Sequence, residues 1–176
     1  GIPWYIDTRL LYYRRDILQQ AGFAAPPVTW AEWEQMLGAI KTMVGRERYS
    51  VLLPLNEFEP LLVLSLQQPS ELLRDNGRYG NFRSAGFHRT LEFYASMFRR
   101  DWAPKMTNTQ VSNVWDEFGR GMFSFYISGP WNITEFRKRL PPQLQDQWMT
   151  APMPGPYGPG ASGPGGCRVP SWASSS

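Results

Sequence analysis

Apolar residues recur at three- and four-residue spacing after Thr29. The apolar positions are Trp30, Trp33, Leu37, Ile40 and Val44. This period is typical of an amphipathic helix that buries one face. Thr29 and Glu32 form a T-x-x-E capping box at its start, in which each side chain accepts a hydrogen bond from the other residue's backbone N–H. We therefore expect a helix from Thr29, with its tryptophans in a core.

Three shorter apolar runs favour strands, because they are too short for typical helices and contain aromatic and β-branched residues. They cover residues 10–13, 49–55 and 122–127. The last run ends at Gly129-Pro130, since proline cannot donate to a strand ladder and glycine adopts unusual dihedral angles. We expect residues 122–127 to lie in a mixed sheet, with the helix from Thr29 packed on it.

Weaker patterns predict further helices, at residues 17–21, 61–68, 87–98, 111–118 and 133–140. Asp16 and Asn132 are expected to cap the first and the last of these, because a short polar side chain before a helix accepts a free N–H. The Asn76-Gly77 pair indicates a hairpin-like turn.

From Ala151 onward the composition changes to prolines alternating with glycines, and the chain ends in Ser-Trp-Ala-Ser-Ser-Ser. Such a segment cannot bury enough apolar surface to offset the entropy lost on ordering. We therefore expect residues 151–176 to be largely unstructured.

Composition limits the classes of function. The chain is long enough for one domain with a core, and its net charge of +3 comes from scattered arginines, which disfavours a nucleic-acid surface. With Cys167 and His88 each alone of their kind, no disulfide framework, cysteine metal site or base-activated nucleophile is predicted. Motifs of P-loops, zinc peptidases and nucleophile elbows do not occur. We expect no catalytic residue, no metal and no cofactor.

Polar residues stand next to aromatic residues at three places in loops or at strand ends. These are Trp4-Tyr5-Ile6-Asp7, Asn56-Glu57-Phe58 and Ser128-Gly129-Pro130-Trp131. Sugar recognition needs this pairing, because the C–H face of a pyranose packs on an aromatic ring while its hydroxyls bond to carboxylates and amides. Trp131 also follows a strand end that leads into a helix, where α/β sheets place ligand-binding groups. From this stretch alone, Trp131 is either a ligand platform or a core anchor.

Several motifs of the chain, in order, resemble the sugar-binding proteins of bacterial ABC importers, the maltose-binding-protein-like extracellular solute-binding family 1. They are GIPWYIDTRLLYYRRDIL from Gly1, Ala21-Gly22-Phe23 with Pro27-Val28-Thr29-Trp30, Glu117-Phe118-x-Arg-Gly, Ser128-Gly129-Pro130-Trp131 and Ala151-Pro152-Met153-Pro154-Gly155. The resemblance covers about residues 1–166.

The resemblance implies a periplasmic binding protein type II-like α/β fold, in which two lobes joined by hinge strands close on a ligand. Because family members are usually more than twice this length, the chain is expected to be incomplete and to hold mostly the second lobe with hinge strands. We expect a hinge or first-lobe strand segment at residues 1–9, a second-lobe α/β domain at 10–150 and the proline- and glycine-rich tail at 151–176.

Position by position, the resemblance places Asp7 at a carboxylate that bonds sugar hydroxyls, and Tyr5 at a ligand-contacting aromatic residue. It places Glu57 near an acidic ligand position of the second lobe and Trp131 at the sugar-stacking tryptophan. Asn56, next to Glu57 in the polar and aromatic loop, completes the candidate ligand residues.

The implied function is that of the substrate-binding component of a carbohydrate ABC importer. Its partners would be a mono- or oligosaccharide and the membrane permease, with no nucleic acid, and the protein would be a monomer in the periplasm or a lipoprotein at the cell surface. Two alternatives stay open. A carbohydrate-active enzyme would need two carboxylates ~5–9.5 Å apart, and a non-functional truncated product would bind no ligand.

Overall fold

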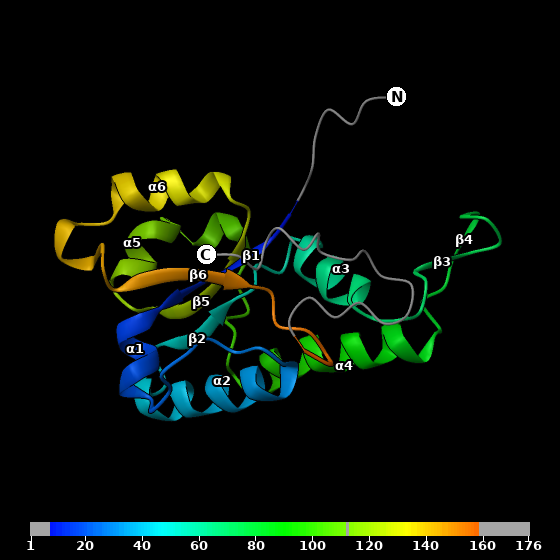
Figure 1. Cartoon of the computed structure of the whole chain (residues 1–176), viewed down its shortest axis with the longest axis horizontal. Helices are drawn as coiled ribbons and strands as arrows, with labels where there is room; N and C mark the ends of the chain where they lie inside the picture. The colour runs from blue at the N-terminus through cyan, green and yellow to red at the C-terminus, as the bar shows by residue number, and fades with distance from the viewer. Residues whose placement is uncertain (1–7, 112, 159–176) are drawn as a thin grey trace.

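The computed structural model describes residues 8–111 and 113–158. Within these ranges the strands form a four-stranded sheet, in the order β2-β5-β1-β6, and a two-stranded hairpin, β3-β4 (Figure 1). The strands of the main sheet are β1 (Leu10–Arg14), β2 (Tyr49–Leu52), β5 (Phe123–Ser128) and β6 (Trp148–Pro152). Those of the hairpin are β3 (Leu73–Arg74) and β4 (Tyr79–Gly80).

Helices cover both faces of the main sheet. They are α1 (Arg15–Gln20), α2 (Trp30–Val44), α3 (Glu59–Leu66), α4 (Ala85–Arg99), α5 (Val114–Gly119) and α6 (Trp131–Arg139), with 3-10 turns η1 (Asn108–Gln110) and η2 (Pro142–Leu144). In Figure 1, α5 and α6 lie above the sheet and α1 and α2 below it, while α3, α4 and the hairpin extend to one side. In the described ranges, none of these helices combines the length and the apolar character needed to span a bilayer.

The predicted packing of α2 on a mixed sheet is confirmed. β2 runs parallel to β5, whereas β1 runs antiparallel to both β5 and β6. Trp33, Leu37 and Ile40 of α2 are fully buried, in one cluster with residues of β1, β2 and β5. The capping box is also present, because Thr29 Oγ1 accepts from the Glu32 N–H and the Glu32 carboxylate accepts from the Thr29 N–H, both at 3.1 Å.

Tyr12 lies at the centre of a second, aromatic core beneath α5 and α6. Its ring stacks on Phe136 with 4.7 Å between centroids and on Trp148 with 6.1 Å. The Tyr12 hydroxyl donates to the carbonyl oxygen of Gly129 at 2.7 Å. Burial, with a smaller contribution from Tyr126, raises the pKa of Tyr12 to about 12, so this hydroxyl remains a donor at neutral pH.

Arg14 joins β1 to the end of α5. Its Nη1 donates to the carbonyl oxygens of Phe118 and Gly119, both at 2.8 Å. These carbonyls lie in the last turn of α5, where the i+4 N–H partners are missing, although the Phe118 carbonyl oxygen also accepts from the Gly121 N–H at 3.0 Å. Asp16 binds the other side of the guanidinium, at 2.8 and 2.6 Å. Asp16 is therefore not the N-cap of α1, as the sequence predicts; that position belongs to Arg14, whose side chain makes no cap bond.

The prediction that Asn132 caps the last helix is also wrong. Helix α6 begins two residues earlier than predicted, at Trp131, with Pro130 as its N-cap. Asn132 is buried, where its amide donates to Ser128 Oγ at 3.0 Å and its oxygen accepts from Trp115 Nε1 at 2.9 Å. These two partners come from β5 and α5, so Asn132 ties α6 to its neighbours instead of satisfying its first turn.

Helix α4 forms as predicted, but it buries a partly different face. Leu91 is 43% exposed, whereas Thr90 is fully buried. The Thr90 hydroxyl donates to the Gly86 carbonyl oxygen at 3.0 Å, so a polar side chain is accommodated in the core at little cost.

The predicted boundary at residue 151 is wrong, because β6 runs on to Pro152 and pairs with β1. Beyond it, Gly155 donates its N–H to the Val28 carbonyl oxygen at 3.1 Å and accepts from the Trp30 N–H at 2.9 Å. The prolines and glycines up to residue 155 are therefore ordered by pairing with distant strands and loops. Residues 159–176 of the predicted tail lie outside the described residues, as do residues 1–7.

We predict that Arg14→Lys lowers the free energy of unfolding by about 2 kcal/mol, since an ammonium group cannot bond two carbonyls and a carboxylate in the same fork geometry. Urea unfolding of the 176-residue chain would measure this as a lower midpoint. Arg99→Lys, at an exposed arginine, is the matched control and should leave the midpoint nearly unchanged. Equal midpoints for both variants would contradict the role given to Arg14.

Candidate functional site

One edge of the main sheet collects the loops that carry the predicted site residues. Because β2, β5 and β6 run in one direction and β1 in the other, three strand ends meet the start of β1 here (Figure 1). Asn56 and Glu57 follow β2, and Trp131 follows β5. Tyr5 and Asp7 precede β1 and lie outside the described residues. Open α/β sheets place ligand sites at such an edge.

Glu57 presents a partly buried carboxylate at this edge. Burial raises the pKa of Glu57, although a hydrogen bond from Asn108 lowers it in part, and the charge of Glu59 raises it further. Asn108 Nδ2 donates to Glu57 Oε1 at 3.4 Å. A carboxylate partly withdrawn from water gains more from each hydrogen bond than one that is fully solvated.

Asn56 holds the loop that carries Glu57 against η1. Its Nδ2 donates to Asn108 Oδ1 at 2.8 Å, and its Oδ1 accepts from the Asn108 N–H at 2.9 Å. Asn108 therefore bonds to both predicted residues of this loop. The amide groups of Asn56 and Asn108 form one unit that orients the carboxylate of Glu57.

A polar cleft of about 360 Å³ opens beside Glu57. Its walls include Asn108, Tyr126, Trp115 and Arg139. Burial raises the pKa of Tyr126, and the charge of Glu57 raises it further. The Arg139 guanidinium carbon lies 4.2 Å from the centroid of the Trp115 ring. Carboxylate, amide, phenol, guanidinium and indole groups thus surround one space, a set that suits a ligand rich in hydroxyls.

Trp131 lies on the same sheet edge, outside the lining of this cleft, and its side chain is 49% exposed. The Arg9 guanidinium carbon is 5.2 Å from the centroid of the Trp131 ring, and Arg9 Nη2 is 3.8 Å from Glu59 Oε1. The charge of Arg9 also lowers the pKa of Glu57 and of Tyr126. Arg9 therefore links the Trp131 platform to the groups of the cleft.

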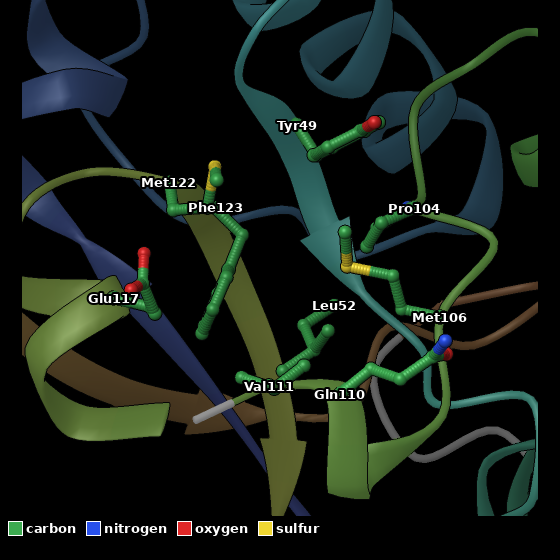
Figure 2. A pocket seen from close by; sticks show the side chains of 9 residues that line it. All are labelled: Tyr49, Leu52, Pro104, Met106, Gln110, Val111, Glu117, Met122 and Phe123. Carbon is green, nitrogen blue, oxygen red and sulfur yellow. The ribbon is translucent and has the colours of Figure 1, made fainter. Parts of the chain in front are cut away.

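A second, apolar pocket of about 100 Å³ adjoins the cleft and shares Leu52 and Val111 with it. Figure 2 shows Leu52, Met106 and Phe123 around its centre, with the carboxylate of Glu117 at its periphery. Apart from Tyr49, Gln110 and Glu117 its lining is apolar, so most hydroxyls of a sugar buried there would find no partner. The polar cleft is therefore the better candidate for a hydroxylated ligand. Among the residues that the structure describes, no cluster of histidine, cysteine and acidic side chains could hold a metal ion.

Sequence reasoning did not single out Arg9, Asn108 or Tyr126. Arg9 lies within the run from Gly1 that resembles the family, but no residue pattern marks it as a ligand contact. Asn108 lies in a segment without hydrophobic periodicity. Tyr126 is one of several aromatic residues in its strand. Only the pairing of β2 with β5, which sets Leu52 opposite Tyr126, brings the Glu57 loop to this tyrosine.

Known proteins resemble this chain over most of its length. The profile of a family described as bacterial extracellular solute-binding protein matches residues 1–175. The sugar-binding protein MalE from Xanthomonas citri is 56% identical, with a TM-score of 0.88 over 93% of this chain and 42% of that chain. A binding protein of Brucella abortus (strain 2308) is 26% identical over 80% of this chain and 35% of its own length. A Deinococcus radiodurans protein named "Probable ABC transporter-binding protein" is 45% identical over 41 residues, 23% of this chain and 10% of its own.

These comparisons confirm the expected fold class, because the chain matches part of the mixed α/β fold of periplasmic sugar-binding proteins. The chain spans 42% or less of the length of these relatives. The matching family and the solved neighbours are binding and transport proteins, which removes the enzyme alternative.

We predict that Glu57→Gln stabilises the chain more at neutral pH than at about pH 4. Because folding raises the pKa of Glu57, the folded state binds more protons, and wild-type stability falls as pH rises from the ordinary value of 4.5 through the folded pKa. Glutamine does not ionise and avoids this loss. Urea midpoints at both pH values would measure the difference.

Glu47→Gln is the matched control for this experiment, because it removes the same charge from an exposed position. It should show no comparable gain between the two pH values. A Glu57→Gln variant whose midpoint follows that of wild type across the range would contradict the predicted effect of burial.

Proposed function

The chain belongs to the bacterial extracellular solute-binding protein family, and we propose that it forms much of the sugar-binding side of the substrate-binding component of a carbohydrate ABC importer. The observation that carries this proposal is the shared sheet edge, where Glu57, Asn108 and Tyr126 surround a polar cleft and Trp131 stands exposed beside it. The 56% identity with a sugar-binding protein supports the same ligand class.

The two parts of the site would act on different faces of a sugar. The Trp131 indole offers a flat apolar surface to the C–H face of a pyranose, an aromatic contact worth ~0.5–1.5 kcal/mol beyond the burial of area. The Glu57 carboxylate accepts hydrogen bonds from hydroxyls, each worth ~1.5–3 kcal/mol net because the acceptor is charged. Glu57 would therefore contribute most to orientation, and Trp131 to packing.

The positive groups nearby extend the same recognition. Arg139 lines the cleft, and Arg9 lies between Trp131 and Glu59. A guanidinium offers several donors in a fixed plane, so each of these arginines can donate to a sugar oxygen while it remains paired with its protein partner. The ligand would thus meet acceptors at Glu57 and donors at the two arginines.

Tyr5 and Asp7 belong to this proposal through their place in the chain. Asp7 stands three residues before Leu10, and Leu10 pairs with Ser128 at the site edge. Three residues span at most ~10 Å, so the Asp7 carboxylate is within reach of the strand ends that carry the site. We propose Asp7 as a second acceptor for hydroxyls and Tyr5 as a further aromatic contact.

The longer relatives extend the proposal to the whole protein. Because the chain covers 42% of its Xanthomonas relative, the cleft would form one side of a site that a second lobe closes, as in the hinge motion of periplasmic binding proteins. The loaded protein would deliver a mono- or oligosaccharide to a membrane permease. Its place would be the periplasm or the outer cell surface.

We predict that the 176-residue chain binds maltose, trehalose or glucose only weakly, with a Kd of roughly 1 mM or above. Losing two or three hydroxyl partners from the opposite side of the site should lower the affinity about 100-fold or more. Saturation-transfer NMR detects such weak binding and should show transfer to the C–H protons of a bound sugar. Trp131→Ala should remove most of that transfer.

Tyr79→Ala is the control, because Tyr79 is also exposed but lies in the β3-β4 hairpin, away from the site edge. This variant should keep the wild-type signal. The proposal fails if none of the three sugars receives saturation, or if Trp131→Ala transfers as well as wild type. Micromolar affinity of the isolated chain would contradict the two-sided site.

A further inference from the structure

The Trp131 indole folds back over the end of β5 and occupies the space next to Gly129. A Cβ on Gly129 would lie 1.9 Å from Cζ3 of the ring, 2.0 Å from Cη2 and 2.3 Å from Cε3. Real Cβ atoms essentially never approach another heavy atom within 3.0 Å. The ring therefore fills the volume in which any other side chain at residue 129 would begin.

The requirement for glycine at this position is steric. The φ of Gly129 is not among the positive values that would favour glycine over other residues. An alanine could adopt this backbone conformation, but it could not share the space with the indole as it lies. Either the backbone or the ring would have to move.

The backbone of Gly129 is held from two sides. Its carbonyl oxygen accepts from the buried Tyr12 hydroxyl at 2.7 Å and from the Asn132 N–H at 3.1 Å. Asn132 is itself buried and bonded to Ser128 and Trp115. Displacing residue 129 would therefore disturb the aromatic core and the start of α6, whereas the 49% exposed Trp131 ring can rotate into solvent by giving up its contact with Arg9.

We propose that Gly129 is a positioning residue for the sugar site, because its lack of a side chain creates the seat in which the Trp131 indole lies. This inference rests on the proposed function for its consequence in ligand binding. The position of the Trp131 ring next to Gly129 can be tested without any ligand. A larger residue at 129 would leave the sheet intact and turn the platform away from the site edge.

The position of the ring can be measured by fluorine NMR of the 176-residue chain labelled with 5-fluorotryptophan. Loss of one resonance in Trp131→Phe assigns the Trp131 signal. Gly129→Ala should shift or broaden that signal and leave the signals of the other tryptophans in place. Gly38→Ala is the matched control, since a Cβ there meets the Trp102 ring at an ordinary 3.4 Å, and it should leave the Trp131 signal unchanged.

If Gly129→Ala folds poorly, a double-mutant cycle with Trp131→Ala, measured by urea unfolding, still tests the inference. Without the indole, the space beside residue 129 is empty, so Gly129→Ala should lower the urea midpoint in the wild-type background more than in the Trp131→Ala background. An equal decrease of the urea midpoint in both backgrounds would contradict the proposed role of Gly129. An unchanged Trp131 resonance in Gly129→Ala would contradict it as well.

Sugar binding separates this inference from the proposed function. In saturation-transfer NMR with maltose, trehalose and glucose, Gly129→Ala should weaken binding roughly tenfold, as Trp131→Ala does, with no further loss in the double variant. If Gly129→Ala displaces the ring but keeps the sugar signal, the role of Trp131 in binding is wrong, whereas the role of Gly129 in positioning the ring is retained. A reduced sugar signal with an undisplaced ring would overturn Gly129 as the positioning residue.

Discussion

The hydrogen bond from the Tyr12 hydroxyl to the Gly129 carbonyl oxygen joins the core of this protein to the sheet edge that carries the candidate site. Tyr12 lies on β1, which is paired on both sides, and its ring is stacked among aromatic residues beneath α6. Because its pKa is raised to about 12, the hydroxyl holds its proton under ordinary conditions. The end of β5, and with it the start of α6 and the place of Trp131, is therefore tied to a fully buried side chain of the core.

Much of the fold could be predicted because its signals are local. The capping box of Thr29 with Glu32 and the turn at Asn76-Gly77 act between neighbours in the chain, and both occur as expected. The failures concern residues whose partners are distant. Asn132 carries the composition of a cap, yet Trp115 on another helix takes its side-chain oxygen. Ala151 and Pro152 were predicted to begin an unstructured tail, yet they pair with β1, whose position no local pattern reveals.

In the candidate site, too, some residues could be predicted from local sequence and others could not. Glu57 and Trp131 could be named from the sequence because each combines a polar or aromatic side chain with a strand end. Arg9 and Tyr126 could not, since they approach Glu57 only after β1 and β2 have each paired with β5. Gly129 was predicted to end a strand, which it does, but its steric relation to Trp131 depends on the side-chain position that follows from the fixed turn.

The middle of the sheet provides stability, whereas the strand ends at one edge carry the candidate binding groups. The middle of the sheet is covered by buried aromatic and aliphatic side chains on both faces, whereas its edge keeps groups that a purely structural protein would not retain there. A carboxylate whose pKa burial has raised lowers stability at neutral pH, and an indole left 49% exposed gives up part of the free energy of burial. If the edge binds a sugar as we propose, hydroxyl donors at Glu57 and an apolar face on Trp131 would recover both costs. This balance of costs supports the proposal that the edge is a ligand-binding surface.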